Sequence, residues 1–258
     1  MQPELQTIIR TRRHALFRAS RHRASAGGMS KGHISPYHAP AFIPDALAKG
    51  QHRAIIGGRW EETGIIQMEM LLAEGLRPRH RMLDIGCGPL RTGCRVVPYL
   101  NPGHYWGSDL SRDLILKGYR AELTEGDRAR LPALQLVEDA DFSFPGIPRD
   151  LDYLLCFAVF THLPVNHLRR GLLRVADHFT RFEKFLFTVF LAPDAQSSLG
   201  PVRQPDGVVT HDIRPPYHLL ESDIHYFCAQ AGLQVSIRAN RLPRGQVLCV
   251  ASRSTANR

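Results

Sequence analysis

A strand that ends in a glycine-rich bend is the feature of this chain that most limits its fold. Residues 82–93 read Met-Leu-Asp-Ile-Gly-Cys-Gly-Pro-Leu-Arg-Thr-Gly, so an apolar run passes an acid and enters a bend with closely spaced glycines. Gly86 and Gly88 lack a Cβ and tolerate positive φ, so a ligand can touch the backbone there. The helix expected next offers free N–H groups and the positive end of its dipole. The pattern predicts a nucleotide-type cofactor site at the carboxyl end of a parallel strand.

Strands and helices alternate after residue 82, which is typical of a parallel sheet covered by helices. We expect strands at 82–86, 104–108, 134–138, 151–158, 184–191, 233–238 and 246–252, and helices near 90–99, 111–124, 164–181 and 219–231. The last two strands are too close in sequence for a helix between them, so they must run antiparallel. The prediction is a doubly wound, Rossmann-like α/β fold. Its seven-stranded, mostly parallel sheet ends in an antiparallel hairpin strand.

The segment before the first strand predicts an amphipathic helix over 59–75. Its apolar stripe would run through Ile65, Met68, Leu71 and Leu72, and Gly75 would end it. A shorter helix is expected near residues 45–53. We therefore divide the chain into a basic, partly disordered N-terminal extension, 1–58, and a folded domain, 59–258.

Positive charge is concentrated in the N-terminal tail. Residues 1–31 hold seven Lys and Arg against the single acid Glu4, which accounts for six of the nine net positive charges. We interpret this tail as a solvated segment, with an acidic partner or an organellar transit peptide as alternatives. The odd number of cysteines and the lack of C-x-x-C spacing favour a reducing compartment, the cytoplasm. The longest apolar run, 154–160, is far too short to cross a bilayer, so no membrane partner is expected.

The glycine spacing discriminates between cofactors. The stretch has G-x-G-x-x-x-x-G instead of the dinucleotide pattern G-x-G-x-x-G. With Asp84 just ahead, it resembles the D-x-G-x-G loop of class I S-adenosylmethionine-dependent methyltransferases of the small-molecule type. The resemblance extends over residues 60–252. It implies S-adenosylmethionine as cofactor, held in this loop by Asp84, Gly86, Cys87, Gly88 and Arg91.

Later strands supply the remaining cofactor contacts that the resemblance implies. Asp109 ends the second strand, where two carboxylate oxygens suit two ribose hydroxyls, and Leu110 follows it. Asp139 and Ala140 follow the third strand as the acidic-small pair that contacts adenine in this family. Phe157 lies at the end of the fourth strand, in a stretch that leads into Val-Phe-Thr-His-Leu and resembles the S-V-F-T-H-L ending of this family.

Methyl transfer to a hydroxyl or protonated amine is helped by a base. We choose His162, at the carboxyl end of the fourth strand, with Glu61 as second candidate. Trp60 is expected to roof the site. The long connection 192–218 is assigned to acceptor recognition, through His211, Tyr217 and His218. The spacing of its histidines is poor for metal binding, so we expect no metal.

The sequence therefore predicts methyl transfer to oxygen or nitrogen of a small molecule, such as a sugar or secondary metabolite. The N/D-P-P-Y/F tetrad and the Pro-Cys nucleophile of DNA methylases are absent, which disfavours nucleic acid. An NAD-dependent oxidoreductase conflicts with the glycine spacing and the hairpin ending. RNA or protein methylation aided by the basic tail remains an alternative, as does a non-catalytic cofactor-binding module. The oligomeric state is left open.

Overall fold

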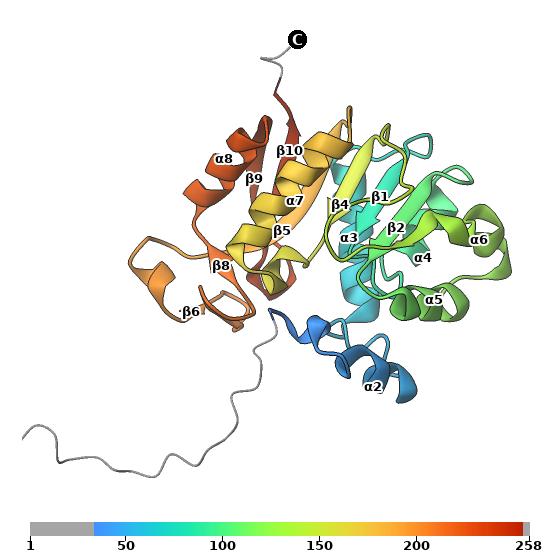
Figure 1. Cartoon of the computed structure of the whole chain (residues 1–258), viewed down its shortest axis with the longest axis horizontal. Helices are drawn as coiled ribbons and strands as arrows, with labels where there is room; N and C mark the ends of the chain where they lie inside the picture. Colours follow the sequence, from blue (N-terminus) through green and yellow to red (C-terminus); the bar gives the residue numbers. More distant parts are fainter. Residues whose placement is uncertain (1–33, 255–258) are drawn as a thin grey trace, which may run out of the picture. The chain divides into compact units, whose positions relative to one another are not determined.

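A central sheet, whose strand order differs from the order along the chain, organises the molecule (Figure 1). The computed structural model describes residues 34–254, and the basic tail lies outside the described residues. The main strands follow the order β3-β2-β1-β4-β5-β10-β9, and a short strand, β8, pairs in parallel with the carboxyl end of β5. The first five strands pair in parallel, whereas β10 pairs antiparallel with both β5 and β9. The predicted fold class is confirmed.

The strands and helices lie close to the predicted positions. The strands are β1 (Met82–Ile85), β2 (Tyr105–Asp109), β3 (Leu136–Glu138), β4 (Tyr153–Cys156), β5 (Lys184–Leu191), β6 (Val202–Arg203), β7 (Val209–Thr210), β8 (His218–Leu219), β9 (Leu233–Arg241) and β10 (Val247–Arg253). The α-helices are α2 (Phe42–Ala48), α3 (Trp60–Ala73), α4 (Gly93–Tyr99), α5 (Arg112–Ala121), α6 (Glu125–Arg130), α7 (Val165–His178) and α8 (Glu221–Gln230). Short 3-10 helices cover η1 (Pro36–His38), η2 (Ala133–Gln135), η3 (Phe160–His162), η4 (Ser197–Leu199) and η5 (Pro243–Gly245).

Helices cover both faces of the sheet, so the inner strands are apolar on both sides. In β4, Leu154 and Cys156 join the core under α7 and α8, whereas Tyr153 and Leu155 join the core beneath α3 and α4. Figure 1 shows α7 and α8 in front of the sheet, with α3 and α4 behind it. All four residues of β4 are buried, as period-two alternation between two cores requires.

The face that α3 buries differs from the predicted stripe. Ile65 and Leu72 are 49% and 43% exposed, whereas Thr63, Gly64 and Gln67 are buried together with Trp60, Met70 and Leu71. The close approach of α4 is the reason. A Cβ at Gly64 would lie 2.4 Å from Nη1 of Arg95, and the Gln67 side chain accepts a hydrogen bond from Arg91. Contacts with two arginines, together with the burial of Trp60, Met70 and Leu71, decide which face of this helix is buried.

Three other segments depart from the predicted organisation. The helix expected at 45–53 lies at Phe42–Ala48 and is followed by Gly50 at φ +69°. Helix α6 was not predicted, although Thr124 and Asp127 form a capping box at its start. The connection 192–218 contains the β6–β7 hairpin and β8.

The extension and the domain are not separated at residue 58 in the structure. All described residues, 34–254, fall within one compact unit. We call residues 34–58 the strap, because they run along the carboxyl ends of the strands before α3 begins. Among the described residues, no helix is long and apolar enough to cross a membrane.

Candidate functional site

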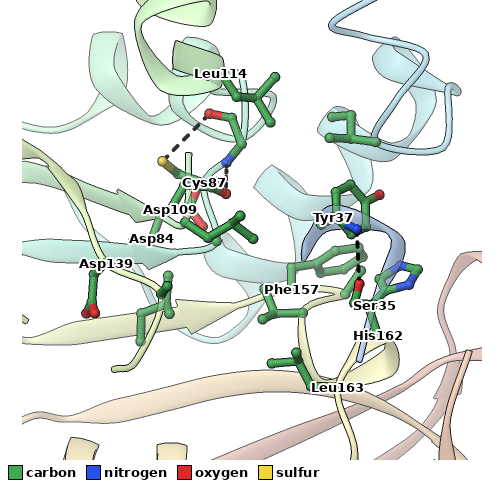
Figure 2. Close-up of a pocket in the computed structure, with 18 of the residues that line it drawn as sticks. Ser35, Tyr37, Asp84, Cys87, Asp109, Leu114, Asp139, Phe157, His162 and Leu163 are labelled. Carbon is green, nitrogen blue, oxygen red and sulfur yellow. Dashed lines mark hydrogen bonds between the residues drawn. The ribbon is translucent and has the colours of Figure 1, made fainter. Parts of the chain in front are cut away.

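A cavity opens at the carboxyl ends of β1, β2 and β4, where the order of the parallel strands reverses (Figure 2). This reversal is the usual position of a ligand site in doubly wound sheets. The cavity encloses about 1070 Å³, counted out to its open mouth. All ten residues predicted to bind the cofactor line it: Asp84, Gly86, Cys87, Gly88, Arg91, Asp109, Leu110, Asp139, Ala140 and Phe157.

The glycine loop bends tightly and is tied to the neighbouring strand. Gly86 and Gly88 take φ of +73° and +53°, a region that side chains with a Cβ rarely adopt. The backbone N–H groups of Gly86 and Cys87 both donate to the Ser108 carbonyl, at 2.7 and 2.9 Å. The loop therefore has a defined shape before any ligand enters.

Asp84 is a buried carboxylate with few partners. It is 2% exposed, and the Tyr105 hydroxyl donates to its Oδ2 at 2.9 Å. Burial raises the pKa of Asp84 to about 7, while the Tyr105 hydrogen bond and the positive charge of Arg91 act in the opposite direction. A carboxylate held at this cost is suited to pair with a cationic group of a ligand.

Asp109, at the end of β2, links that strand to the glycine loop after β1. Its Oδ2 accepts from the Gly88 N–H and its Oδ1 from the Ser111 N–H, each at 3.0 Å. Burial raises its pKa to about 6, against these backbone hydrogen bonds. The Ser111 hydroxyl caps α5 by accepting from Leu114 N–H, so Asp109 is not needed as that cap.

Arg91 brings a positive charge into the same cavity. Its guanidinium donates to the Gln67 side chain at 3.3 Å and to the strap carbonyls of Ile56 and Gly58 at 3.3 and 3.4 Å. Burial lowers the pKa of Arg91 to about 10, and the Asp84 carboxylate opposes that shift. Arg91 remains charged at neutral pH, so the cavity presents one cation beside two buried carboxylates.

Asp139 lines the cavity, but its carboxylate is used within its own loop. Its Oδ1 accepts from Asp141 N–H, Ser143 N–H and the Ser143 hydroxyl, and its Oδ2 accepts from Phe144 N–H. The side chain therefore shapes the turn that carries Ala140 and Phe142 past the cavity.

His162 lies in the cavity wall beside a strap residue. Its imidazole meets the Tyr37 ring edge to face, with ring centroids 5.2 Å apart, and Figure 2 shows the two together. Burial and the positive charge of Arg244 lower the pKa of His162 to about 4, so the ring is neutral at physiological pH. No residue in the described range 34–254 hydrogen-bonds its ring nitrogens, which leaves them available to a ligand.

The strap supplies wall residues that the sequence did not reveal, namely Ser35, Tyr37, His38 and Ile56. Ser35 is 1% exposed, and Nδ1 of His38 is buried without a hydrogen-bond partner. No periodic pattern marks this segment. The only sequence signal was the run of polar and aromatic residues around Pro36.

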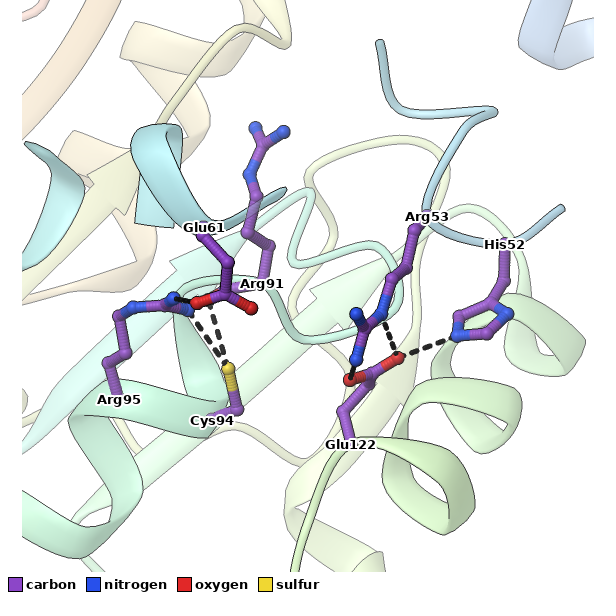
Figure 3. A network of polar contacts seen from close by, with 7 residues as sticks. All are labelled: His52, Arg53, Glu61, Arg91, Cys94, Arg95 and Glu122. Atoms are coloured by element: carbon purple, nitrogen blue, oxygen red, sulfur yellow. Dashed lines mark hydrogen bonds and ion pairs between the residues drawn. The ribbon is translucent and has the colours of Figure 1, made fainter. Parts of the chain in front are cut away.

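Charged contacts fasten the strap to the domain (Figure 3). Glu122, at the end of α5, accepts from Arg53 Nε and Nη2 at 2.8 and 2.6 Å, and lies 2.6 Å from His52 Nε2. Burial alone would raise the pKa of Glu122, but the hydrogen bonds from Arg53 and His52 lower it. The Glu122 carboxylate, which we call the latch, thus binds two strap residues, His52 and Arg53, to the end of α5.

Glu61 and Trp60, predicted as base and roof, do not line the cavity. The Glu61 carboxylate is 71% exposed and pairs with Arg95 at 2.5 Å, on the side of α3 that Figure 3 shows. Trp60 is buried beneath the guanidinium of Arg53, 4.8 Å from its ring. Because of the orientation of α3, the side chains of Trp60 and Glu61 lie outside the cavity wall.

The predicted acceptor residues of the long connection also lie outside the cavity wall. Both ring nitrogens of His218 are occupied, by the Thr210 hydroxyl at 2.9 Å and the Ser198 carbonyl at 3.0 Å. His211 is buried in the same connection, bonded through its backbone to Pro216 and His218. Tyr217 donates its hydroxyl to the Ile34 carbonyl and its N–H to Thr161. These residues support the strap and the His162 turn from outside.

Comparisons with known proteins agree with this geometry. Residues 83–181 match a family described as a methyltransferase domain. A magnesium protoporphyrin IX methyltransferase from Synechocystis, solved with bound S-adenosylmethionine, has a TM-score of 0.51 at 15% identity, over 84% of this chain and 93% of its own. An S-adenosylmethionine-dependent methyltransferase from Clostridium acetobutylicum has a TM-score of 0.52 at 15% identity, covering 84% and 99%.

A third solved structure, the glycopeptide N-methyltransferase MtfA with sinefungin, has a TM-score of 0.54 at 15% identity, covering 74% of this chain and 94% of its own. Identities this low establish the shared fold, and the family match adds the methyltransferase domain itself. The glycine spacing, the strand order and the family match agree with one another. Residues 83–181 therefore match a methyltransferase-domain family, and the described chain has the fold of solved S-adenosylmethionine-dependent methyltransferases.

Proposed function

We propose that this protein transfers a methyl group from S-adenosylmethionine to an oxygen or nitrogen atom of a small molecule, within the cavity beneath the strap. The observation that carries the proposal is that one cavity holds the buried charges of Asp84, Arg91 and Asp109 together with the neutral imidazole of His162. No residue in the described range 34–254 hydrogen-bonds the nitrogens of that ring. A covered site suits a small acceptor better than a flat macromolecular surface.

The charges at the β1 end of the cavity fit the amino-acid part of the cofactor. Asp84 would bind the ammonium group, since its carboxylate is buried and its hydrogen bonds with Tyr105 and Thr92 leave acceptor capacity on the oxygens. Arg91 would bind the carboxylate, because its Nη2 makes no hydrogen bond within residues 34–254. Both interactions replace water around groups that are costly to leave unpaired.

The nucleoside part fits the opposite side. The oxygens of Asp109 accept backbone hydrogen bonds from Gly88, Leu110 and Ser111 and keep capacity for ribose hydroxyls. Leu110, Leu114 and Phe142 offer an apolar slot for the adenine, and Ala140 offers backbone beside it. Asp139 would act indirectly here, by holding the 139–144 turn.

When bound, the cofactor supplies a methyl group on a positively charged sulfur. The protein has to align the acceptor in line with that methyl group, exclude water and receive the acceptor's proton. The strap residues Tyr37 and Ile56 would screen part of the cavity from water, and His162 would receive the proton on a ring nitrogen that no residue of 34–254 hydrogen-bonds. Asp84, Arg91 and Asp109 would hold the cofactor so that its methyl group could pass directly from the sulfur to the acceptor atom.

His162→Asn should lower kcat about 10²–10³-fold while leaving the affinity for S-adenosylmethionine unchanged, because only proton transfer is lost. In the wild-type protein, kcat at saturating cofactor should stay flat between pH 5 and 8 as far as this group is concerned, since the imidazole protonates only near pH 4. Single-turnover kinetics across this range measure both effects. Unchanged kcat in the variant would remove His162 as the base.

Glu122→Gln should weaken S-adenosylmethionine binding about three- to tenfold. The substitution removes the ion pair between the half-exposed Arg53 and the buried Glu122, which contributes about 1 kcal/mol to holding the strap against α5. Since the pKa of Glu122 is lowered in the folded state, its stabilising contribution is present above its unfolded pKa and is lost as pH falls. Calorimetric titration of the variant and the wild type at pH 8, where Glu122 and Asp84 are both ionised, measures the effect. Glu125→Gln, which removes an exposed carboxylate of α6, is the matched control. Equal affinities for both variants would contradict the latch.

The proposed function is tested by offering labelled S-adenosylmethionine together with separate pools of metabolites, RNA and proteins. Label transfer to a small molecule is expected. Transfer only to RNA or protein would contradict the small-acceptor assignment. Cofactor binding without transfer to any pool would favour a non-catalytic module.

A further inference from the structure

A second hollow, which we name the arginine hollow, lies next to the strap. It is formed by the start of α3, the β6–β7 turn and the β9–β10 turn, with the polar residues Arg59, Glu62, Asp206, Arg241 and Arg244 in its wall. Three arginines and two acids give it a net positive charge.

The strap segment 56–58 connects this hollow with the cofactor cavity. Arg91, in the cavity, donates to the carbonyls of Ile56 and Gly58, whereas Arg244, in the hollow, donates to the Gly57 carbonyl at 2.8 Å. The two guanidinium groups therefore hold the same short piece of backbone. A molecule whose charged end reaches Arg244 is close to the wall of the methyl-transfer site.

The acids of the hollow do not neutralise Arg241 and Arg244. Arg59 lies 3.4 Å from Asp206 Oδ2 and 3.8 Å from Glu62 Oε2, so one arginine contacts both carboxylates. Within the described residues 34–254, no carboxylate pairs with the side chain of Arg241 or Arg244. Arg241 donates instead to the Gly245 carbonyl at 3.3 Å. Two guanidinium groups are thus left to bind an anion.

The turn that carries Arg244 is held in an uncommon conformation. Arg244 has φ +66°, in the left-handed region that residues other than glycine rarely occupy. Asp206 Oδ2 holds it by accepting the Arg244 N–H at 2.9 Å, and a Cβ at Gly245 would lie 3.0 Å from Pro205. Such strain persists where the surroundings enforce it, and it gathers at functional sites.

The charge of Arg244 also acts inside the cavity. It contributes to lowering the pKa of His162 and opposes the rise in the pKa of Tyr37. These effects place the guanidinium within electrostatic range of the residues around the transferred methyl group.

We propose that Arg241 and Arg244 bind an anionic group of the methyl acceptor, a carboxylate or a phosphate, in the arginine hollow. The planar guanidinium matches either oxyanion with paired hydrogen bonds. The inference rests on the proposed function and adds to it the acceptor's charge.

The hollow is tested directly by titrating ¹⁵N-labelled protein with inorganic phosphate and, separately, with acetate at low ionic strength. Amide signals of the β9–β10 turn should shift, and Arg241→Gln and Arg244→Gln should each weaken binding about two- to fivefold, as exposed charge pairs do. Arg244→Lys keeps the charge but loses the planar pair of donors, so its affinity should lie between those of Arg244→Gln and the wild type. Arg120→Gln, on the exposed face of α5, is the charge-matched control and should behave as wild type. Equal affinities in all variants, or shifts confined to other regions, would overturn the inference. Whichever of phosphate and acetate binds more tightly indicates whether the anionic group of the acceptor is a phosphate or a carboxylate.

A second experiment links the hollow to turnover. Paired acceptors that differ only in a carboxylate or carboxamide are offered with labelled cofactor, and cofactor affinity is first measured by calorimetry. The acid should be methylated at least about tenfold more efficiently, and Arg241→Gln should remove most of that preference. Equal turnover of acid and amide would overturn the inference. Absence of cofactor binding by the wild-type protein would overturn the proposed function, whereas cofactor binding without an anion response at Arg244 would overturn only the inference.

Discussion

Replacing Asp84 by asparagine is expected to weaken S-adenosylmethionine binding about 30- to 100-fold, about 2–3 kcal/mol, because a buried charge-assisted hydrogen bond is lost. The amide keeps the size of the side chain and can still accept the Tyr105 hydroxyl. The loss should therefore come from the missing negative charge and not from a collapsed site.

The same substitution should stabilise the cofactor-free protein at high pH. The pKa of Asp84 rises from 3.8 to about 7 on folding, so the folded state favours the protonated carboxyl group. This contribution to the free energy of unfolding is fully present below pH 4 and is lost as pH rises through 7. Asparagine does not ionise, so the variant should gain about 2–4 kcal/mol over wild type at pH 8 and nothing at pH 4. The effect also predicts that wild-type binding releases protons near pH 7.

Denaturant unfolding at both pH values, and calorimetry in buffers of different ionisation enthalpy, measure these effects. Asp177→Asn, which changes an exposed carboxylate of α7, serves as control and should alter neither quantity. Tight cofactor binding by Asp84→Asn would contradict the assignment of Asp84 to the ammonium group. If the variant were less stable than the wild type at pH 8, burial of the ionised Asp84 carboxylate would not destabilise the folded protein, contrary to this prediction.

Gly118→Ala should be strongly destabilising, although alanine is the better helix former. A Cβ at Gly118 would lie 2.2 Å from the Pro89 carbonyl oxygen and 2.6 Å from its Cα, so the backbone after the glycine loop would have to move. We expect a loss of about 3 kcal/mol, or about 6–12 °C in Tm, together with weaker cofactor binding.

Gly126→Ala is the matched control in a neighbouring helix. There the added Cβ meets only the Thr124 hydroxyl, at 3.8 Å. It should leave cofactor affinity unchanged and raise stability by up to about 1 kcal/mol, as helix propensity predicts. Thermal unfolding of the two variants side by side decides the question. Similar melting temperatures would show that α5 does not support the loop in this way.

The parts of the site that lie directly at strand ends could be predicted from the sequence. Asp84, Gly88 and Asp109 follow apolar runs, and parallel strands bring their carboxyl ends to one edge of the sheet. The antiparallel ending followed from a connection too short for a helix, and the structure confirms it. Each of these inferences needed only neighbouring residues and one general property of sheets.

The cover of the site could not be predicted in the same way. Tyr37 faces His162, and Arg53 reaches Glu122, across separations of more than sixty residues. Neither pair leaves a local pattern. Glu61 was assigned to the site because of its helix, yet the pairing of that helix with α4 turns its carboxylate outward to Arg95.

Local periodicity and glycine spacing thus determine the sheet and the bend beneath the cofactor, because they depend on backbone geometry over a few residues. Which side chains close the cavity, and whether Asp84 or His162 is charged, depends on what packs against them from distant parts of the chain. Desolvation and long-range contacts exist only once the chain has folded.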